Sequence, residues 1–231
     1  MGAWDRRIRP GQTSPVAPGL VIWDCDGVIV DSERLVTRLE AQWITALGWP
    51  LTQAEVVARF VGRSEEHMAT EIERRVDRVP PGWFDDQRAA SHELLRTELT
   101  PVDGVTVAMD ALDAAGVPMC VASSSDHDRL RLVLGQTGLL ARFADRIHSA
   151  TDVDNGKPAP DLFLRAAEVH GVSPARCVVV EDSTPGVTAG VAAGMRTLGF
   201  AGGLTPADRL RDAGAEVFDQ MAELPALLAL R

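Results

Sequence analysis

The stretch Gly19-Leu20-Val21-Ile22-Trp23-Asp24-Cys25-Asp26-Gly27 decides the fold. Its apolar first half predicts a short buried strand, and its second half places two acidic residues and a glycine where that strand ends. Similar apolar runs recur along the chain, at residues 117–122, 146–148, 177–180, 196–200 and 216–218. Amphipathic helical patterns separate most of them, at residues 105–115, 128–138, 160–170 and 185–193. This alternation predicts an α/β fold, a Rossmann-like parallel sheet with helices on both faces.

One long stretch, residues 32–101, interrupts the alternation because it carries helix signals and no convincing strand. Four apolar residues with a spacing of four predict a buried helical stripe: Leu35, Leu39, Trp43 and Leu47. The segment from Thr52 to Glu55 is a capping-box pattern that opens a second helix, and Ser64 is a candidate cap for a third. The stretch is therefore interpreted as an all-helical insertion.

The expected domain organisation follows from these patterns. Residues 1–18 contain arginines and prolines but no apolar core of a signal peptide, so they are interpreted as a flexible tail. Residues 19–31 and 102–231 form the α/β core, and residues 32–101 form a helical cap inserted into it. Because the chain crosses twice between the two parts, we expect the cap to open and close about those crossings.

The composition excludes several classes of protein. The 231 residues carry 33 acidic and 23 basic side chains, a net charge of −10 that argues against a nucleic-acid or anionic-membrane surface. No apolar run approaches the roughly 18 residues of a membrane span. Three cysteines are too few for a disulfide framework and are expected to be buried free thiols, which favours a cytoplasmic protein. Of the 23 basic residues, 22 are Arg and one, Lys157, is Lys.

Polar residues follow four of the predicted strands, and the carboxyl ends of parallel strands meet at one edge of the sheet, where ligands bind. They comprise Asp24 and Asp26 after the first strand, Ser123 and Ser124 after the second, Lys157 beyond the third, and Glu181 and Asp182 after the fourth. This convergence predicts one site built from carboxylates, hydroxyls and a single ammonium group.

The charges of that site predict a bound cation. Four carboxylates close together are costly unless a cation is present or a carboxyl is protonated, and one lysine cannot balance them. A cluster of oxygen ligands without His or Cys calls for a hard divalent ion, with Mg²⁺ the first choice. The predicted metal residues are Asp24, Asp26, Glu181 and Asp182.

The spacing of Asp24 and Asp26 indicates phosphoryl transfer. Residues i and i+2 of a tight loop can face the same site, so one carboxylate can attack while its neighbour handles the proton. Ser123, a backbone N–H near Ser124, and Lys157 can hold the transferring phosphoryl group. The expected partner is therefore a small phosphorylated metabolite.

These residues resemble the haloacid dehalogenase superfamily, in the subclass with a helical cap after its first motif. Asp24-Cys25-Asp26-Gly27-Val28-Ile29-Val30-Asp31-Ser32-Glu33 is similar to motif one, Ser123 to motif two, Lys157-Pro158-Ala159-Pro160-Asp161 to motif three and Glu181-Asp182-Ser183 to motif four. The resemblance implies Asp24 as nucleophile and Asp26 as general acid and base. It also implies Mg²⁺ bound by the Asp24 carboxylate, the Asp26 carbonyl and Asp182, with Glu181 close by or acting through water.

Within that superfamily, the motifs resemble phosphatases of small sugar phosphates, phosphogluconate or phosphoglycolate, and also β-phosphoglucomutase. The likeness to the mutase is incomplete. Val36 stands where the mutase has a cap histidine, Asp126 and His127 replace its Lys and Asn, and the cap contains no lysine. A phosphatase is therefore the preferred hypothesis and a phosphosugar mutase the alternative.

Two further interpretations stay open. A phospho-aspartate signalling module also uses an acidic cluster, a hydroxyl and a lysine, although the long insertion and the Asp24–Asp26 spacing argue against it. In the cap, Gly62-Arg63-Ser64 is either a substrate-facing loop, with Arg63 a candidate phosphate ligand, or a plain helix cap. The sequence does not indicate the oligomeric state.

Overall fold

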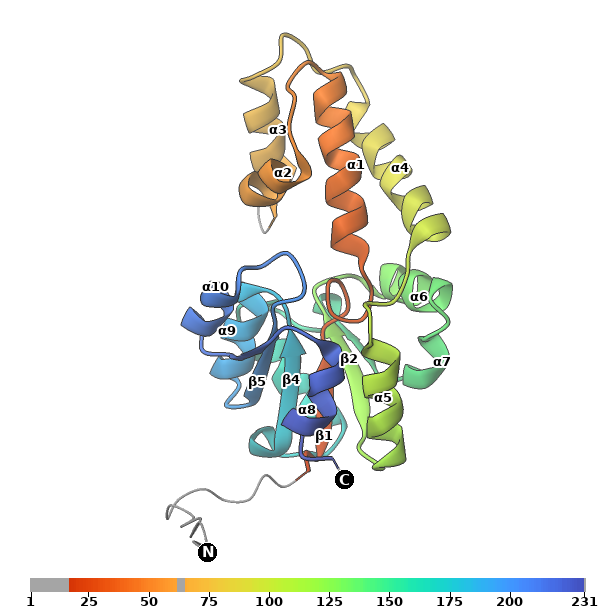
Figure 1. The fold of residues 1–231 in the computed structure, drawn as a ribbon, viewed down its shortest axis with the longest axis vertical. Helices are drawn as coiled ribbons and strands as arrows, with labels where there is room; N and C mark the ends of the chain where they lie inside the picture. Colours follow the sequence, from red (N-terminus) through yellow and green to blue (C-terminus); the bar gives the residue numbers. More distant parts are fainter. Residues whose placement is uncertain (1–16, 62–64, 231) are drawn as a thin grey trace, which may run out of the picture.

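The computed structural model describes residues 17–61 and 65–230 (Figure 1). Its centre is a six-stranded sheet with the strand order β3-β2-β1-β4-β5-β6, in which every neighbouring pair is parallel. The strands are β1 (Leu20–Trp23), β2 (Met119–Ser123), β3 (Ile147–Ser149), β4 (Cys177–Glu181), β5 (Arg196–Phe200) and β6 (Glu216–Phe218). The predicted α/β fold is confirmed.

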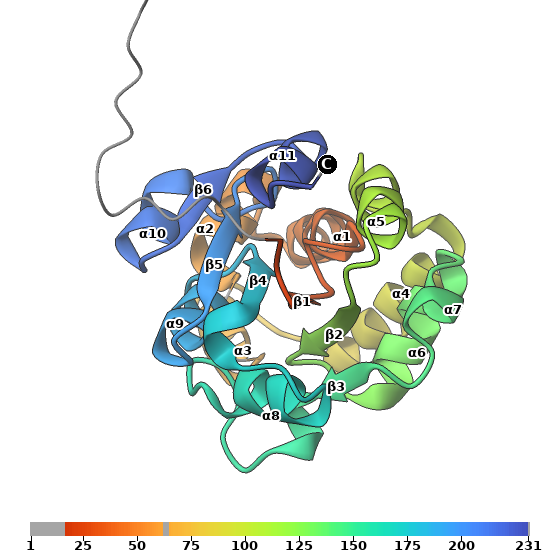
Figure 2. The same ribbon diagram turned by 90° about the horizontal axis from the view of Figure 1, so that it is seen from below.

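Helices cover both faces of this sheet (Figure 2). They are α5 (Val105–Ala114), α6 (His127–Gln136), α7 (Leu140–Phe143), α8 (Asp161–Val169), α9 (Thr184–Ala192), α10 (Ala207–Asp212) and α11 (Leu224–Leu227). Alternate residues of β1 enter different hydrophobic clusters. Val21 and Trp23 pack with α5, α6, α7 and α11, whereas Leu20 and Ile22 pack with α8 and α9. Burial on both faces explains why the strand reads as a continuous apolar run.

The described residues between β1 and β2 form helices and no strand. They comprise α1 (Ser32–Ala46), α2 (Gln53–Phe60), α3 (Glu65–Glu73) and α4 (Trp83–Glu98), which lie beyond the carboxyl ends of the strands (Figure 1). These helices enclose a hydrophobic cluster of their own, formed by Ala41, Ile44, Leu51, Val56, Phe60, Ile72 and Trp83. A separate cluster supports our proposal that residues 32–101 are a cap domain.

The helical stripe predicted for α1 is displaced on the helix. Leu35, Leu39, Trp43 and Leu47 are only partly buried. The fully buried positions are Ser32, Thr37, Ala41 and Ile44, because α1 contacts both α2 and α4 and its buried face is centred between them.

The predicted capping box at α2 is present. The Thr52 side chain accepts a hydrogen bond from the Glu55 N–H, and the Glu55 carboxylate accepts one from the Thr52 N–H. Ser64, the predicted cap of the third helix, lies outside the described residues.

The two crossings between core and cap run side by side. Val30 forms an antiparallel bridge with Pro101, the Asp31 N–H donates to the Thr100 carbonyl at 3.0 Å, and the Val102 N–H donates to the Ile29 carbonyl at 2.9 Å. Pairing concentrates both crossings in one narrow connection. A hinge at this connection stays a prediction.

The three cysteines are free and buried, as expected. The predicted tail lies outside the described residues except for residues 17 and 18. None of the helices in the described part of the chain combines the length and the hydropathy that a membrane crossing requires.

Candidate active site

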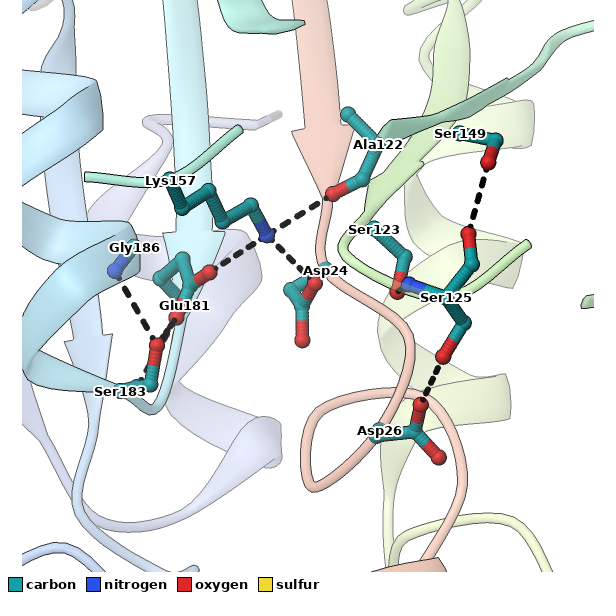
Figure 3. Close-up of polar contacts among 10 residues, drawn as sticks. All are labelled: Asp24, Asp26, Ala122, Ser123, Ser125, Ser149, Lys157, Glu181, Ser183 and Gly186. Atoms are coloured by element: carbon teal, nitrogen blue, oxygen red, sulfur yellow. Dashed lines mark hydrogen bonds and ion pairs between the residues drawn. The ribbon is translucent and has the colours of Figure 1, made fainter. Parts of the chain in front are cut away.

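A buried lysine–carboxylate cluster lies at the carboxyl edge of the sheet (Figure 3). Lys157 Nζ is 2.6 Å from Asp24 Oδ1 and 2.7 Å from Glu181 Oε1, and it donates to the Ala122 carbonyl at 3.0 Å. The lysine side chain is 3% exposed, so all three of its donors are used within the protein. Burial opposes the charged ammonium, but the carboxylates of Asp24 and Glu181 outweigh this effect and raise the pKa of Lys157.

Asp24, Glu181 and Asp182 form an acidic cluster in which one carboxylate oxygen of each residue lies within 4.8 Å of the others. Burial, together with the neighbouring Glu181 carboxylate, raises the pKa of Asp24 to about 7 despite the Lys157 ammonium. Burial and the carboxylates of Glu33 and Glu181 raise the pKa of Asp182 well above its usual range. The single ammonium therefore leaves negative charge uncompensated.

This donor set fits a hard divalent cation. Its ligands are buried carboxylate oxygens, and burial together with neighbouring carboxylates raises the pKa values of Asp24 and Asp182, an effect that a bound cation would offset. An ion bound there would be held by Asp24 and Asp182, with Glu181 already engaged by Lys157 and by the N–H and hydroxyl of Ser183.

Two glycines allow the chain to pass close to these carboxylates. A Cβ on Gly186, in the first turn of α9, would lie 1.7 Å from Glu181 Oε1, and one on Gly27 would lie 2.1 Å from Asp182 Oδ2. Gly27 also has φ +78°, which side chains rarely adopt. Only glycine fits at these two positions without displacing a site carboxylate.

Asp26 lies apart from the lysine cluster and is held by hydrogen bonds of its own. Its carboxylate accepts from Ser125 Oγ at 2.9 Å (Figure 3). It also accepts from Arg129 Nη2 at 2.9 Å and from Ser32 Oγ. Burial raises the pKa of a carboxyl, but the Arg129 guanidinium and the hydroxyls of Ser32 and Ser125 outweigh it and lower the pKa of Asp26. Asp26 is therefore ionised in this arrangement.

The remaining predicted site residues are placed as follows. Ser123 is buried at the end of β2, and its Oγ accepts from the Ser125 N–H at 3.2 Å. Ser124 is exposed beside it. Asp126 caps α6 by accepting from the Arg129 N–H. Arg63 lies outside the described residues.

A pocket of about 440 Å³ lies between this edge of the sheet and the cap helices. Its walls include Asp26, Ser125 and Arg129 from the core and Glu33, Gln87 and His92 from the cap. Burial and the neighbouring carboxylates of Asp26 and Glu181 raise the pKa of Glu33 to about 7. The pocket is large enough for a small metabolite, and a metabolite bound there would contact side chains of both the core and the cap.

Sequence reasoning missed the residues that hold Asp26. Ser32 belongs to the first motif, but its residue type alone does not indicate a contact with Asp26. Arg129 is 103 residues from Asp26 along the chain. Their positions in the sequence could have indicated this role. Ser125 precedes the helix that follows β2, Arg129 lies in its first turn, and the N-terminus of that helix is near the carboxyl edge of the sheet.

The chain belongs to the haloacid dehalogenase-like hydrolase family, whose model matches residues 18–194. It is 31% identical to 6-phosphogluconate phosphatase of Escherichia coli over 189 residues, 78% of this chain and 81% of that protein. It is 32% identical to β-phosphoglucomutase of Mycobacterium bovis, covering 88% of this chain and 90% of that one. The resemblance noted from the motifs is confirmed.

A solved structure of a family member has the same fold as this chain. The haloacid dehalogenase family hydrolase from Deinococcus radiodurans, which was crystallised with bound phosphate and sodium, superposes with a TM-score of 0.84 at 34% identity. The match covers 93% of this chain and 96% of that one.

Proposed function

We propose that this protein is a Mg²⁺-dependent phosphatase that hydrolyses a small phosphorylated metabolite, such as a sugar phosphate or sugar-acid phosphate, through an aspartyl-phosphate. The observation that carries the proposal is the buried cluster in which Lys157 contacts Asp24 at 2.6 Å and Glu181 at 2.7 Å beside Asp182. Such a cluster suits a reaction whose catalysis depends on positioning and charge stabilisation.

Asp24 is the nucleophile in this proposal. Its free carboxylate oxygen attacks phosphorus, the P–O bond to the leaving group breaks, and an aspartyl-phosphate forms. Lys157 holds the other oxygen, Asp24 Oδ1, and thereby fixes the direction of attack. Ser123, at the end of the adjacent strand, is placed to hold the phosphoryl oxygens.

Asp26 moves the protons. It donates a proton to the leaving oxygen in the first step. In the second step it removes a proton from the water that attacks phosphorus, the P–O bond to Asp24 breaks, and inorganic phosphate leaves. Its contacts with Arg129, Ser32 and Ser125 favour the ionised form, so this arrangement suits the second step. Donation in the first step requires Asp26 to leave Arg129 and to take up a proton from solvent beforehand, and closure of the cap over the pocket is a movement that can separate the two side chains.

The metal would be held by Asp24, Asp182 and the Asp26 carbonyl, as in the family. When bound, it supplies positive charge that offsets the carboxylates and the phosphoryl group. The cap helices contribute by covering the pocket and excluding bulk water.

The mutase alternative has less support in the local contacts. His127, at the position where the mutase has an Asn, contacts Asp152 at 2.9 Å, and Asp126 serves as a helix cap. Val36, at the mutase histidine position, lines the pocket without a polar group. The signalling alternative is disfavoured by the pocket between core and cap, which is large enough for a small metabolite.

A panel assay tests the proposal. Metal-free protein is supplied with Mg²⁺ and with sugar phosphates, sugar-acid phosphates and p-nitrophenyl phosphate, and free phosphate is measured. Steady release supports a phosphatase. Isomerisation of glucose 1-phosphate without release would favour the mutase, and a single phosphorylation without turnover would favour the signalling module.

A further inference from the structure

A second cluster of ligating side chains lies away from the active site, on the α8 face of the sheet. It consists of Cys120 on β2, His148 on β3 and His170 at the C-terminal end of α8, with one ligand atom of each within 4.8 Å of the others. The three elements are neighbours in the fold (Figure 2). The proposed reaction does not use these residues.

The spacing of the two imidazoles matches a shared metal ion. His148 Nε2 and His170 Nε2 are 3.4 Å apart, and the ring planes are 84° from each other. Two Zn–N bonds of about 2.0–2.1 Å at a tetrahedral angle separate their nitrogens by about 3.3–3.4 Å. A direct hydrogen bond between nitrogens would favour about 3.0 Å. The observed distance therefore fits ligands around one ion better than a direct bond.

The chemical state of the ligands agrees with this geometry. Burial and the neighbouring His170 lower the pKa of His148 to about 4, and burial with the Arg146 guanidinium lowers the pKa of His170. Both shifts favour the neutral imidazole, which offers a lone pair to a metal ion. Burial and the neighbouring Cys177 raise the pKa of the Cys120 thiol, so Cys120 supplies negative charge only by releasing its proton when the ion binds.

Access to the cluster is from one side. Cys120 and His148 are buried, whereas His170 is partly exposed at the end of its helix. An ion can therefore reach the cluster past His170, and water can complete a four-coordinate shell.

We propose that Cys120, His148 and His170 form a binding site for one borderline-soft divalent ion of the Zn²⁺ class. Nitrogen and sulfur donors distinguish it from the all-oxygen cluster of the active site, which favours Mg²⁺. The ion ties together β2, β3 and α8. Since the Ala122 carbonyl, two residues after Cys120, accepts from Lys157, the site braces the strand that supports the active-site lysine. Its expected role is structural.

Cobalt substitution tests the site in the full chain. Metal-stripped protein is first saturated with Mg²⁺ and then titrated with Co²⁺. We expect one equivalent to produce the intense visible bands of tetrahedral Co²⁺ and a thiolate-to-cobalt charge-transfer band in the near ultraviolet. Stoichiometric Zn²⁺ should abolish both and raise the melting temperature. Absence of the thiolate band at one equivalent would overturn the proposal.

Variants assign the signal to these residues. His170→Gln changes a partly exposed ligand and should weaken Co²⁺ binding more than about tenfold. Cys177→Ser is the matched control, because Cys177 is a buried thiol of the same hydrophobic cluster but not one of the three ligands. Full Co²⁺ affinity in folded His170→Gln, or loss of the thiolate band in folded Cys177→Ser, would contradict the assignment. Phosphatase activity is measured separately with Mg²⁺, so failure of this proposal leaves the proposed function untouched.

Discussion

At the scale of single residues, Lys157 shows why one lysine is found in a chain with 22 arginines. Its ammonium makes three contacts in three directions, to Asp24, Glu181 and the Ala122 carbonyl, inside a buried gap lined by the Phe163 ring 5.0 Å away. A compact ammonium suits converging acceptors, whereas a guanidinium is planar and larger.

Replacing Lys157 by arginine keeps the positive charge and changes the size and shape of the charged group, so it tests which of the two the site requires. We expect Lys157→Arg to lose at least about 100-fold in kcat, comparable to the loss of one group that stabilises the transition state. Overpacking of the buried gap should also cost about 1–3 kcal/mol of unfolding free energy. Arg131→Lys, at an exposed position, is the control. Turnover near wild type in Lys157→Arg would show that charge alone is sufficient.

Arg129 provides a second prediction, about stability and pH. Removing it in Arg129→Met leaves a mostly buried carboxylate with fewer donors, which should cost about 1–3 kcal/mol at neutral pH. Because the folded-state pKa of Asp26 is lowered, the pair stabilises the fold above the usual carboxyl pKa of 3.8 and loses this effect as the pH falls through the folded value.

The measurement is denaturant unfolding of Arg129→Met between pH 3 and pH 8, with Arg131→Met as the exposed control on the same helix. The deficit of Arg129→Met should be full at neutral pH and shrink under acid conditions. If Arg129→Met loses the same unfolding free energy at every pH, Arg129 does not stabilise the fold through the Asp26 carboxylate.

At the scale of elements, the site is made by strand ends and by close passage of the following turns. Gly186 lets the first turn of α9 approach Glu181, and the Ser183 hydroxyl caps that helix while donating to the same carboxylate. The strand, its turn and the helix therefore position Glu181 as one unit.

Adding a methyl group at this turn should disrupt the unit. Gly186→Ala places a Cβ 1.7 Å from Glu181 Oε1, so either the carboxylate or the helix must move. We expect at least about a tenfold loss of kcat/KM and a lower melting temperature. Gly156→Ala is the control, since its Cβ would meet only ordinary contact at 3.8 Å. Unchanged kinetics in Gly186→Ala would show that Glu181 need not be fixed.

Helix α1 carries a partly buried acid, Glu40, which lines the pocket. Burial raises its pKa to about 7 from 4.5, so the folded state binds the proton more tightly and its stability falls as the pH rises between these values. Glu40→Gln should raise the melting temperature by about 2–4 °C at pH 8, equivalent to about 1 kcal/mol, and have little effect at pH 5. Exposed Glu66→Gln should change neither value. If Glu40→Gln raises the melting temperature more at pH 5 than at pH 8, the pKa of Glu40 is not raised in the folded state.

At the scale of the whole molecule, the sequence predicted most of the architecture. Strands β1, β2 and β4 are nearly continuous apolar runs, whereas β3 and β6 are short and carry a weaker apolar pattern. Most helices of the core and cap have caps or periodicity that local rules detect. Helices α7, α10 and α11 are too short for such periodicity. The strand order depends on long-range packing and is not encoded in any single segment.

The candidate site also contains residues that could be predicted from the sequence and residues that could not. Asp24, Lys157, Glu181 and Asp182 were predictable because the carboxyl ends of parallel strands converge. The Asp26–Arg129 pair was not, because it depends on how a loop after β1 meets a helix after β2. The cysteine–histidine cluster was also missed, since its members are individually ordinary core residues.

The most direct test of the central claim is the rate of phosphate release from a sugar phosphate by wild type and by Asp24→Asn, each with Mg²⁺ and with a chelator. The substitution keeps the size of the side chain and removes the attacking carboxylate. We expect release by wild type only with Mg²⁺, and a loss of more than about 1,000-fold in folded Asp24→Asn. Undiminished release by Asp24→Asn, or release by wild type without a divalent metal, would contradict the account.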